Sequence, residues 1–180
     1  MKYAVLLRGI NVGGNNLIKM VELRSCLENA GFDRVKTYIQ SGNIIITSDE
    51  TDKQKITDRI EQAITKAFTL IVPVVVISYD ELKTIVDNTP AGWGDDPEWK
   101  FSYLFLKPPY DMNDVIASIG QLKPGIETLT PGEGVLYQSL AFKLFGHTTT
   151  GKLASMPVYK MMTIRNHRTV PKLLALMAQG

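Results

Sequence analysis

The chain has very little of the side-chain chemistry that builds disulfides and metal centres. It contains one cysteine, Cys26, which excludes an internal disulfide and a cysteine-based metal cluster. Its two histidines, His147 and His167, are too far apart to match the spacing of a zinc site. We therefore predict no metal site, and the single thiol is typical of a protein of the reducing cytoplasm.

Long apolar runs are also missing. No stretch approaches the roughly 20 residues that a membrane helix needs, and the first residues lack the basic, apolar and small-residue layout of a signal peptide. The 44% of hydrophobic and 21% of charged residues are ordinary values for a soluble protein with a core. We expect a cytoplasmic globular protein with one domain or two small ones among its 180 residues.

Acidic residues are absent from the C-terminal part of the chain. Glu133 is the last of them, and the positive side chains that follow it are Lys143, Lys152, Lys160, Arg165, Arg168 and Lys172. A segment whose charged side chains are all positive favours an anionic partner such as nucleic acid, a nucleotide or a phosphorylated metabolite. A solvated surface balanced by the acidic remainder of the chain is an equally supported interpretation.

The first 88 residues alternate strand and helix patterns. We predict strands at 2–7, 35–39, 44–47 and 72–77, and helices that begin near Met20, Thr51 and Ser78. Thr51-x-x-Gln54 and Ser78-x-x-Glu81 both have the form of a capping box, and Pro73 indicates an edge strand. This β-α-β-β-α-β order with one added helix is the ferredoxin-like arrangement.

A stretch rich in Pro, Gly and Asp at 89–97 predicts a linker, after which the plan repeats. We predict strands at 101–106, 126–130, 135–139 and 159–164, helices at 112–119 and from Thr169, and a short helix at 152–156 in the poorly patterned segment 141–157. The predicted fold is therefore α+β with two tandem ferredoxin-like halves. The N-terminal subdomain covers 1–88, and a ferredoxin-like variant covers 99–180.

Two polar, glycine-containing segments stand at predicted strand ends in the first half. One runs from Arg8 to Asn16 after the first strand, and the other is Ser41-Gly42-Asn43 between strands two and three. In this topology strand three lies between strands one and two and runs antiparallel to both, so the two segments share one end of the sheet. Converging backbone N–H groups in such loops can hold an anion. A purely structural tight loop is equally consistent with the glycines.

Three segments carry a family resemblance: Leu-Leu-Arg-Gly-Ile-Asn-Val-Gly-Gly at 6–14, Thr-Tyr-Ile-Gln-Ser-Gly-Asn at 37–43, and Thr-Ile-Arg-Asn-His-Arg-Thr-Val-Pro-Lys-Leu at 163–173. They resemble the signature segments of a widespread bacterial family of conserved proteins of unknown function. The resemblance implies a cytoplasmic α+β protein and brings no activity, substrate or cofactor with it. By similarity, the polar motif positions are Arg8, Asn11, Gly13, Gly14, Ser41, Gly42, Asn43, Arg165 and Asn166.

Other motifs give no catalytic residue. Gly146-x-x-x-x-Gly151-Lys152 imitates a phosphate-binding loop, but Leu153 occupies the position of the magnesium-binding Ser or Thr, which favours a chance match. Ser41 lacks the flanking pattern of a nucleophile elbow. The aromatic residues that alternate in the strand at 101–106 could stack RNA bases, but core packing explains them equally well.

These patterns predict a binding protein whose glycine–asparagine loop accepts a phosphate-bearing small molecule or nucleotide. Arg8 would supply charge, Gly13 and Gly14 backbone donors, and Asn11 and Asn43 orienting hydrogen bonds. Arg165 would join this site if the two halves pack with their polar ends together, and would otherwise mark a second site or cap a helix. The first alternative is a hydrolase or group-transfer enzyme acting on a phosphorylated metabolite, for which Ser41 and His167 are the available groups. The second is binding of a nucleic-acid backbone by the basic C-terminal third.

Overall fold

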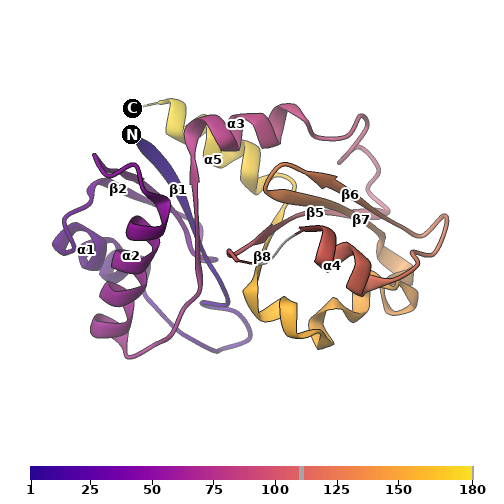
Figure 1. Cartoon of the computed structure of the whole chain (residues 1–180), viewed down its shortest axis with the longest axis horizontal. Coiled ribbons are helices and arrows are strands. Elements are labelled where there is room, and N and C mark those ends of the chain that lie inside the picture. Colours follow the sequence, from indigo (N-terminus) through magenta and orange to yellow (C-terminus); the bar gives the residue numbers. More distant parts are fainter. Residues whose placement is uncertain (110–111, 180) are drawn as a thin grey trace. The chain divides into compact units, whose positions relative to one another are not determined.

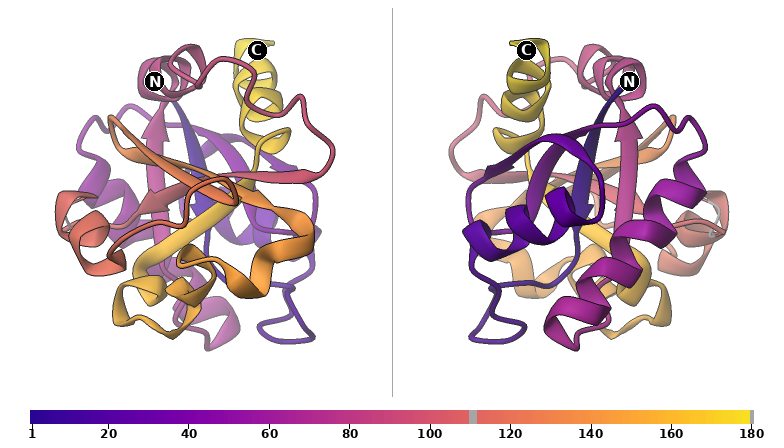
Figure 2. Two further views of the ribbon diagram at one scale, coloured as in Figure 1. Left: turned by 90° about the vertical axis from the view of Figure 1, so that its right-hand side faces the viewer. Right: turned by 90° about the vertical axis from the view of Figure 1, so that its left-hand side faces the viewer.

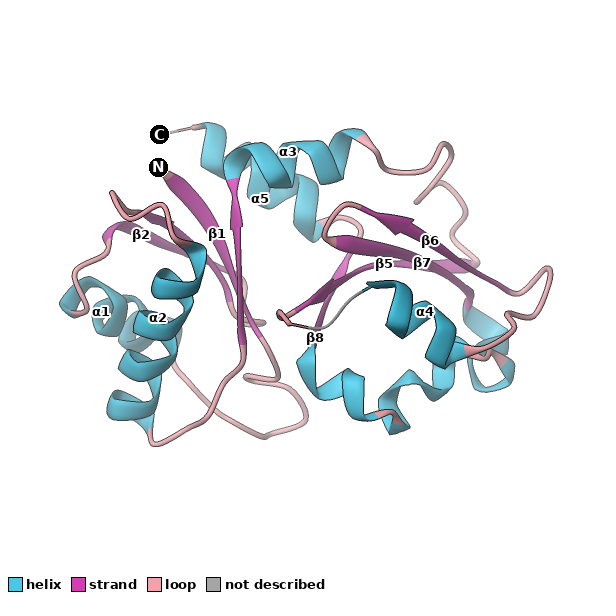
Figure 3. Cartoon of the chain, viewed as in Figure 1, coloured by secondary structure: helices cyan, strands magenta, loops and turns pink. Residues whose placement is uncertain are grey.

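The computed structural model describes residues 1–109 and 112–179 and has an α+β fold (Figures 1 and 3). It contains two four-stranded sheets, and the strand order and antiparallel pairing of each are those of a ferredoxin-like half. The chain divides into two compact units, Met1–Lys83 with Lys172–Gly180, and Thr84–Pro171. None of the helices in the described ranges is long and apolar enough to cross a membrane.

The first unit is built on a sheet of order β2-β3-β1-β4. Its elements are β1 (Lys2–Leu7), α1 (Met20–Asn29), β2 (Asp33–Tyr38), β3 (Asn43–Thr47), α2 (Lys53–Phe68) and β4 (Val74–Ser78), followed by α3 (Tyr79–Asp87). Helices α1 and α2 lie together on one face of this sheet (Figure 2, right). Strand β4 is an edge strand, as Pro73 at its start predicted.

The core of the first unit centres on β1, which is apolar at successive positions because it is buried on both faces. Tyr3, Val5 and Leu7 pack with Leu23 and Leu27 of α1, and with the isoleucines of α2 and β3. Burial of each such aliphatic side chain is worth roughly 1.5–3 kcal/mol. The position of β1 is therefore strongly determined by the hydrophobic pattern.

Two helix starts show how local chemistry positions the elements. The predicted capping box at α3 is present, since Glu81 N–H donates to Ser78 Oγ (3.3 Å) and Ser78 N–H donates to Glu81 Oε2 (2.9 Å). The prediction for α2 is wrong by one residue. Asp52, and not Thr51, is the N-cap, and its carboxylate accepts the Gln54 N–H (2.9 Å). A carboxylate here also interacts favourably with the helix dipole.

The second unit repeats the topology with a sheet of order β6-β7-β5-β8. Its elements are β5 (Trp99–Leu106), α4 (Met112–Ile119), β6 (Glu127–Gly132), β7 (Val135–Ala141), η1 (Phe142–His147), η2 (Thr150–Ser155), η3 (Pro157–Met161) and β8 (Met162–Asn166), and α5 (Thr169–Ala178) follows. The three short 3-10 helices stand where the crossover α-helix of the first unit stands. The short helix predicted at 152–156 is a 3-10 helix at Thr150–Ser155, and the last strand begins three residues later than predicted.

Glu127, at the start of β6, holds this irregular segment in place. The residue is 3% exposed, and its carboxylate accepts the N–H groups of Lys123 (2.9 Å), Thr149 (2.7 Å) and Thr150 (2.8 Å), together with the Thr150 hydroxyl (2.7 Å). Burial alone would raise the pKa of Glu127, but these hydrogen bonds outweigh it and lower the pKa from 4.5 to about 2.

The turn between β2 and β3 is packed tightly against the end of β1. Leu7 N–H donates to the Gly42 carbonyl at 2.8 Å, and Gly42 has a φ of +74°. A Cβ atom on Gly42 would lie 2.7 Å from Leu7 Cβ and 3.0 Å from Ile10 Cδ1. Glycine is required here both for its backbone conformation and for the close approach of two chain segments.

Substituting Gln for Glu127 is expected to destabilise the second unit at pH 7 by about 3 kcal/mol and to flatten its acid dependence. The folded-state pKa is lowered, so the carboxylate stabilises the fold above pH 4.5, and this contribution is lost as the pH falls towards 2. Urea unfolding followed by tryptophan fluorescence reports on this unit, because Trp93 and Trp99 both lie in it. The exposed Glu133→Gln is the control, and parallel pH profiles for Glu127→Gln and wild type would contradict the assignment.

A second prediction compares two glycines with similar backbone conformations. Gly14 has a φ of +78° and nothing within 4 Å of an added Cβ. Gly14→Ala is expected to cost only the left-handed backbone penalty of roughly 1–2 kcal/mol. Gly42→Ala adds a steric overlap worth about 1–3 kcal/mol more. Native-state hydrogen exchange of β1 and β3 amides measures both effects, and equal losses of protection would show that the turn is not tightly packed.

Candidate functional site

The loop after β1 (8–16) and the β2–β3 turn (39–42) meet at one end of the strands of the first sheet. We call this end of the sheet the rim. The register that pairs Leu6 with Asn43 brings the end of β1 beside the turn. Asn11 Nδ2 donates to the Gln40 carbonyl at 2.9 Å, in addition to the hydrogen bond between Leu7 and Gly42. Two polar segments thirty residues apart are thus in direct contact, as the predicted topology required.

The exposed part of the loop is a small β-hairpin tip. Asn11 N–H donates to the Asn16 carbonyl (3.2 Å), and residues 12–15 form the turn, closed by a hydrogen bond of 3.1 Å between its ends. Gly13 and Gly14 have φ angles of +59° and +78°, the pattern of a two-residue type I′ turn. These two glycines are therefore explained by turn geometry, while their N–H groups stand outside the closing hydrogen bond.

The side chain of Asn11 fixes the conformation of this loop by hydrogen bonds to the backbone. Its Oδ1 accepts the Ile18 N–H (2.8 Å), and its Nδ2 donates to the Ile18 carbonyl as well as to Gln40, each at 2.9 Å. Asn16 acts similarly by donating to the Gly9 carbonyl at 3.1 Å. Because the amide of Asn11 is occupied by backbone groups, its role is to fix the loop against the turn.

Asn43 is fully buried at the start of β3. Its Nδ2 donates to Ser41 Oγ (2.9 Å) and to the Tyr38 carbonyl (3.3 Å). This differs from the expected role of Asn43 as a ligand-facing amide, because a buried side chain does not reach solvent. Ser41 is half-buried, and its hydroxyl accepts from Asn43, which leaves the hydroxyl proton to be donated elsewhere.

Arg8 follows β1 at the point where three backbone segments meet. Its N–H donates to the Pro73 carbonyl (2.9 Å) just before β4, and the preceding residue bonds to the β2–β3 turn. Nearby, Glu61 of α2 accepts the Val74 N–H at 2.8 Å. Glu61 could not be predicted from the sequence, because a carboxylate at a polar helical position carries no local sign of such a contact. The rim thus has one half-buried arginine and one half-buried carboxylate at its β4 side.

Arg165 and Asn166 belong to the second unit, at the end of β8. Arg165 is 6% exposed, and its Nη1 donates to Thr163 Oγ1 (3.1 Å) and the Ile164 carbonyl (2.9 Å). Burial lowers the pKa of Arg165 to about 10, a value still high enough for the guanidinium to be protonated at neutral pH. Asn166 is exposed, and its Oδ1 accepts the Arg168 N–H (2.9 Å). Arg165 is therefore a buried cation, whereas binding of a nucleic-acid backbone would use cations at the protein surface.

The remaining candidates do not assemble a catalytic or metal centre. Across 1–109 and 112–179, no three His, Cys, Asp or Glu side chains are placed to hold a metal ion. His167 is half-buried against Phe101, with 5.7 Å between ring centroids. Gly146 and Gly151 fall in successive 3-10 helices, so the backbone there is not a phosphate-binding loop that opens an α-helix.

Comparisons with known proteins agree with the resemblance of the signature segments. A search among curated proteins found no match to this chain. Among solved structures, the chain is similar to the conserved bacterial protein SP0830 from Streptococcus pneumoniae, with 32% sequence identity, 98% of each chain covered and a TM-score of 0.85. A family described as protein of unknown function (DUF1697) matches residues 1–137, which include the signature segments at 6–14 and 37–43. The chain therefore belongs to the DUF1697 family.

Proposed function

We propose that the protein binds a phosphate-bearing small molecule or nucleotide at the rim of the first sheet. The observation that supports this proposal is the position of Arg8, which follows β1 directly between the β2–β3 turn and the segment before β4. The guanidinium group offers several N–H donors in a planar fork that matches the oxygens of a phosphate.

The groups around Arg8 divide into those that build the rim and those that are available to a ligand. Asn11, Gly42 and Asn43 fix the loop and the turn through backbone contacts. The Ser41 hydroxyl proton and the two glycine N–H groups at the hairpin tip remain as donors. Supporting contacts of this kind hold a binding loop in one conformation before the ligand arrives, which favours binding.

The same geometry favours binding over catalysis by Ser41. The Ser41 hydroxyl interacts with the amide of Asn43, and an amide cannot take a proton from a serine nucleophile. A nucleophilic serine needs a base within hydrogen-bond reach. Binding therefore stands ahead of hydrolysis or group transfer.

Replacing Arg8 by Ala is expected to weaken phosphate binding by about 10- to 150-fold, because a hydrogen bond to a charged group contributes about 1.5–3 kcal/mol. The measurement is a titration of the full chain with inorganic phosphate, pyrophosphate, AMP and ATP, followed by amide chemical shifts at fixed ionic strength. Shifts are expected at the hairpin tip and at Ser41.

The matched control is Arg24→Ala, which removes an exposed arginine from α1 of the same unit, where it pairs with Glu28 at 2.8 Å. Arg8→Lys separates charge from geometry and is expected to retain part of the affinity. Equal affinities for the Arg8→Ala and Arg24→Ala variants, or no response of the wild type to any of the four ligands, would exclude the proposed site.

A further inference from the structure

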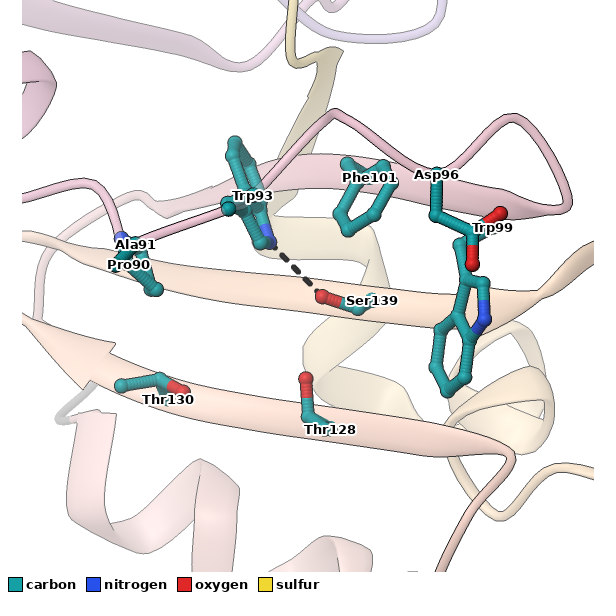
Figure 4. Close-up of a pocket in the computed structure, with 10 residues that line it drawn as sticks. Pro90, Ala91, Trp93, Asp96, Trp99, Phe101, Thr128, Thr130 and Ser139 are labelled. Carbon is teal, nitrogen blue, oxygen red and sulfur yellow. Dashed lines mark hydrogen bonds between the residues drawn. The ribbon is translucent and has the colours of Figure 1, made fainter.

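The second unit contains a cleft of about 390 Å³. None of the residues that the sequence predicted to bind a ligand lines this cleft. The segment from Pro90 to Asp96 forms one side of it, and the sheet forms its floor (Figure 4). The volume falls in the range of roughly 300–1,000 Å³ that is typical of small-molecule sites.

The floor is a row of side chains across three strands. Phe101 of β5 pairs with Ser139 of β7, which in turn pairs with Thr128 of β6. Thr130 lies two residues further along β6, on the same face. Both threonines are exposed on this edge strand, so their hydroxyl groups are accessible and can donate as well as accept hydrogen bonds.

The two tryptophans stand on either side of this row (Figure 4). Trp93 is held by its Nε1–H, which donates to Ser139 Oγ at 2.9 Å, and it meets Tyr103 edge-on with 4.7 Å between ring centroids. On the other side, the backbone N–H of Trp99 donates to the Asp96 carbonyl (3.2 Å), which fixes the backbone at Trp99. The aromatic walls are thus positioned by contacts within the unit and do not depend on a ligand.

The charge of the cleft decides which ligands it suits. Among the described residues that line the cleft, Asp96 carries the single formal charge, and none of them is a lysine or an arginine. A phosphate would meet a negative carboxylate with no cation to balance it, so the cleft does not suit the phosphorylated ligands proposed for the rim. Hydroxyl groups and a carboxylate instead match a ligand that presents several hydroxyl groups of its own.

We propose that the cleft binds an uncharged sugar. The C–H bonds on one face of a pyranose or furanose ring are weakly positive, and they are attracted to the negative face of an indole ring. The sugar hydroxyls donate to the Asp96 carboxylate and exchange hydrogen bonds with Thr128 and Thr130. All the described residues that line this site belong to the second unit.

The chain provides its own probe for this proposal, because its two tryptophans both line the cleft. Tryptophan fluorescence of the full chain is followed during titration with glucose, galactose, N-acetylglucosamine, ribose and cellobiose. Glucose 6-phosphate and choline are titrated in parallel. At least one neutral sugar is expected to shift the emission with a dissociation constant in the low millimolar range or below, and glucose 6-phosphate is expected to bind at least tenfold more weakly than glucose.

Asp96→Asn tests the carboxylate, with the neighbouring exposed Asp95→Asn as the matched control because Asp95 does not line the cleft. Asp96→Asn is expected to weaken sugar binding about 10-fold or more, and Thr128→Val is expected to weaken it severalfold, while Asp95→Asn leaves it unchanged. The proposal is overturned if no sugar shifts the emission up to about 50 mM. Tighter binding of choline than of any sugar, or equal affinities for the Asp96→Asn and Asp95→Asn variants, would overturn it as well.

Discussion

The antiparallel pairing of β1 with β3 determines where the polar groups of the first unit lie. Val5 stands opposite Ile44 and Leu6 opposite Asn43, so the chain leaves β1 beside the turn that leads into β3. A slip of one residue would turn the core-facing side chains of β1, such as Tyr3, Val5 and Leu7, to the other face of the sheet. The hydrophobic core therefore fixes the register, and the register in turn places Arg8 at the rim.

Most of the polar side chains at the rim are used to build it. The loop and the turn leave N–H and C=O groups outside the pairing of the sheet, and Asn11 and Asn16 bond several of them. Asn43 does the same from a buried position. The number of polar residues in the sequence therefore overstates how many side chains face a ligand, and the binding proposed above rests mainly on Arg8 and Ser41.

The parts of the fold that follow from local patterns were predictable from the sequence. The bounds of β1, the capping box of Ser78 and Glu81, and the edge position of β4 are examples. The helix start at Asp52 was placed one residue early because two adjacent residues, Thr51 and Asp52, both suit an N-cap. Periodicity could not predict the 3-10 segment, since Glu127 orders it from more than twenty residues away.

The same limit explains why the cleft of the second unit was not found from sequence. Trp93 lies in a segment that its composition marks as a linker, and only the tertiary structure shows that it packs on the aromatic face of the sheet. Tyr103 and Tyr137 are 1% and 2% exposed beneath it. Their hydroxyls are also engaged, Tyr103 with Thr89 Oγ1 at 2.9 Å and Tyr137 as donor to the Ile85 carbonyl at 2.7 Å.

This packing decides what the aromatic face can do. Sheet faces that read RNA leave their rings open so that bases can stack on them. Here an indole ring of the chain itself meets Tyr103 and Tyr137 edge-on, and a base could stack on them only by displacing Trp93 and breaking its hydrogen bond to Ser139. The segment from Pro90 to Asp96 thus covers part of the sheet face on which a single-stranded nucleic acid would lie, and it forms one side of a cleft there. Among the described residues that line this cleft there is one carboxylate and no cation, an electrostatic environment that opposes a phosphate group.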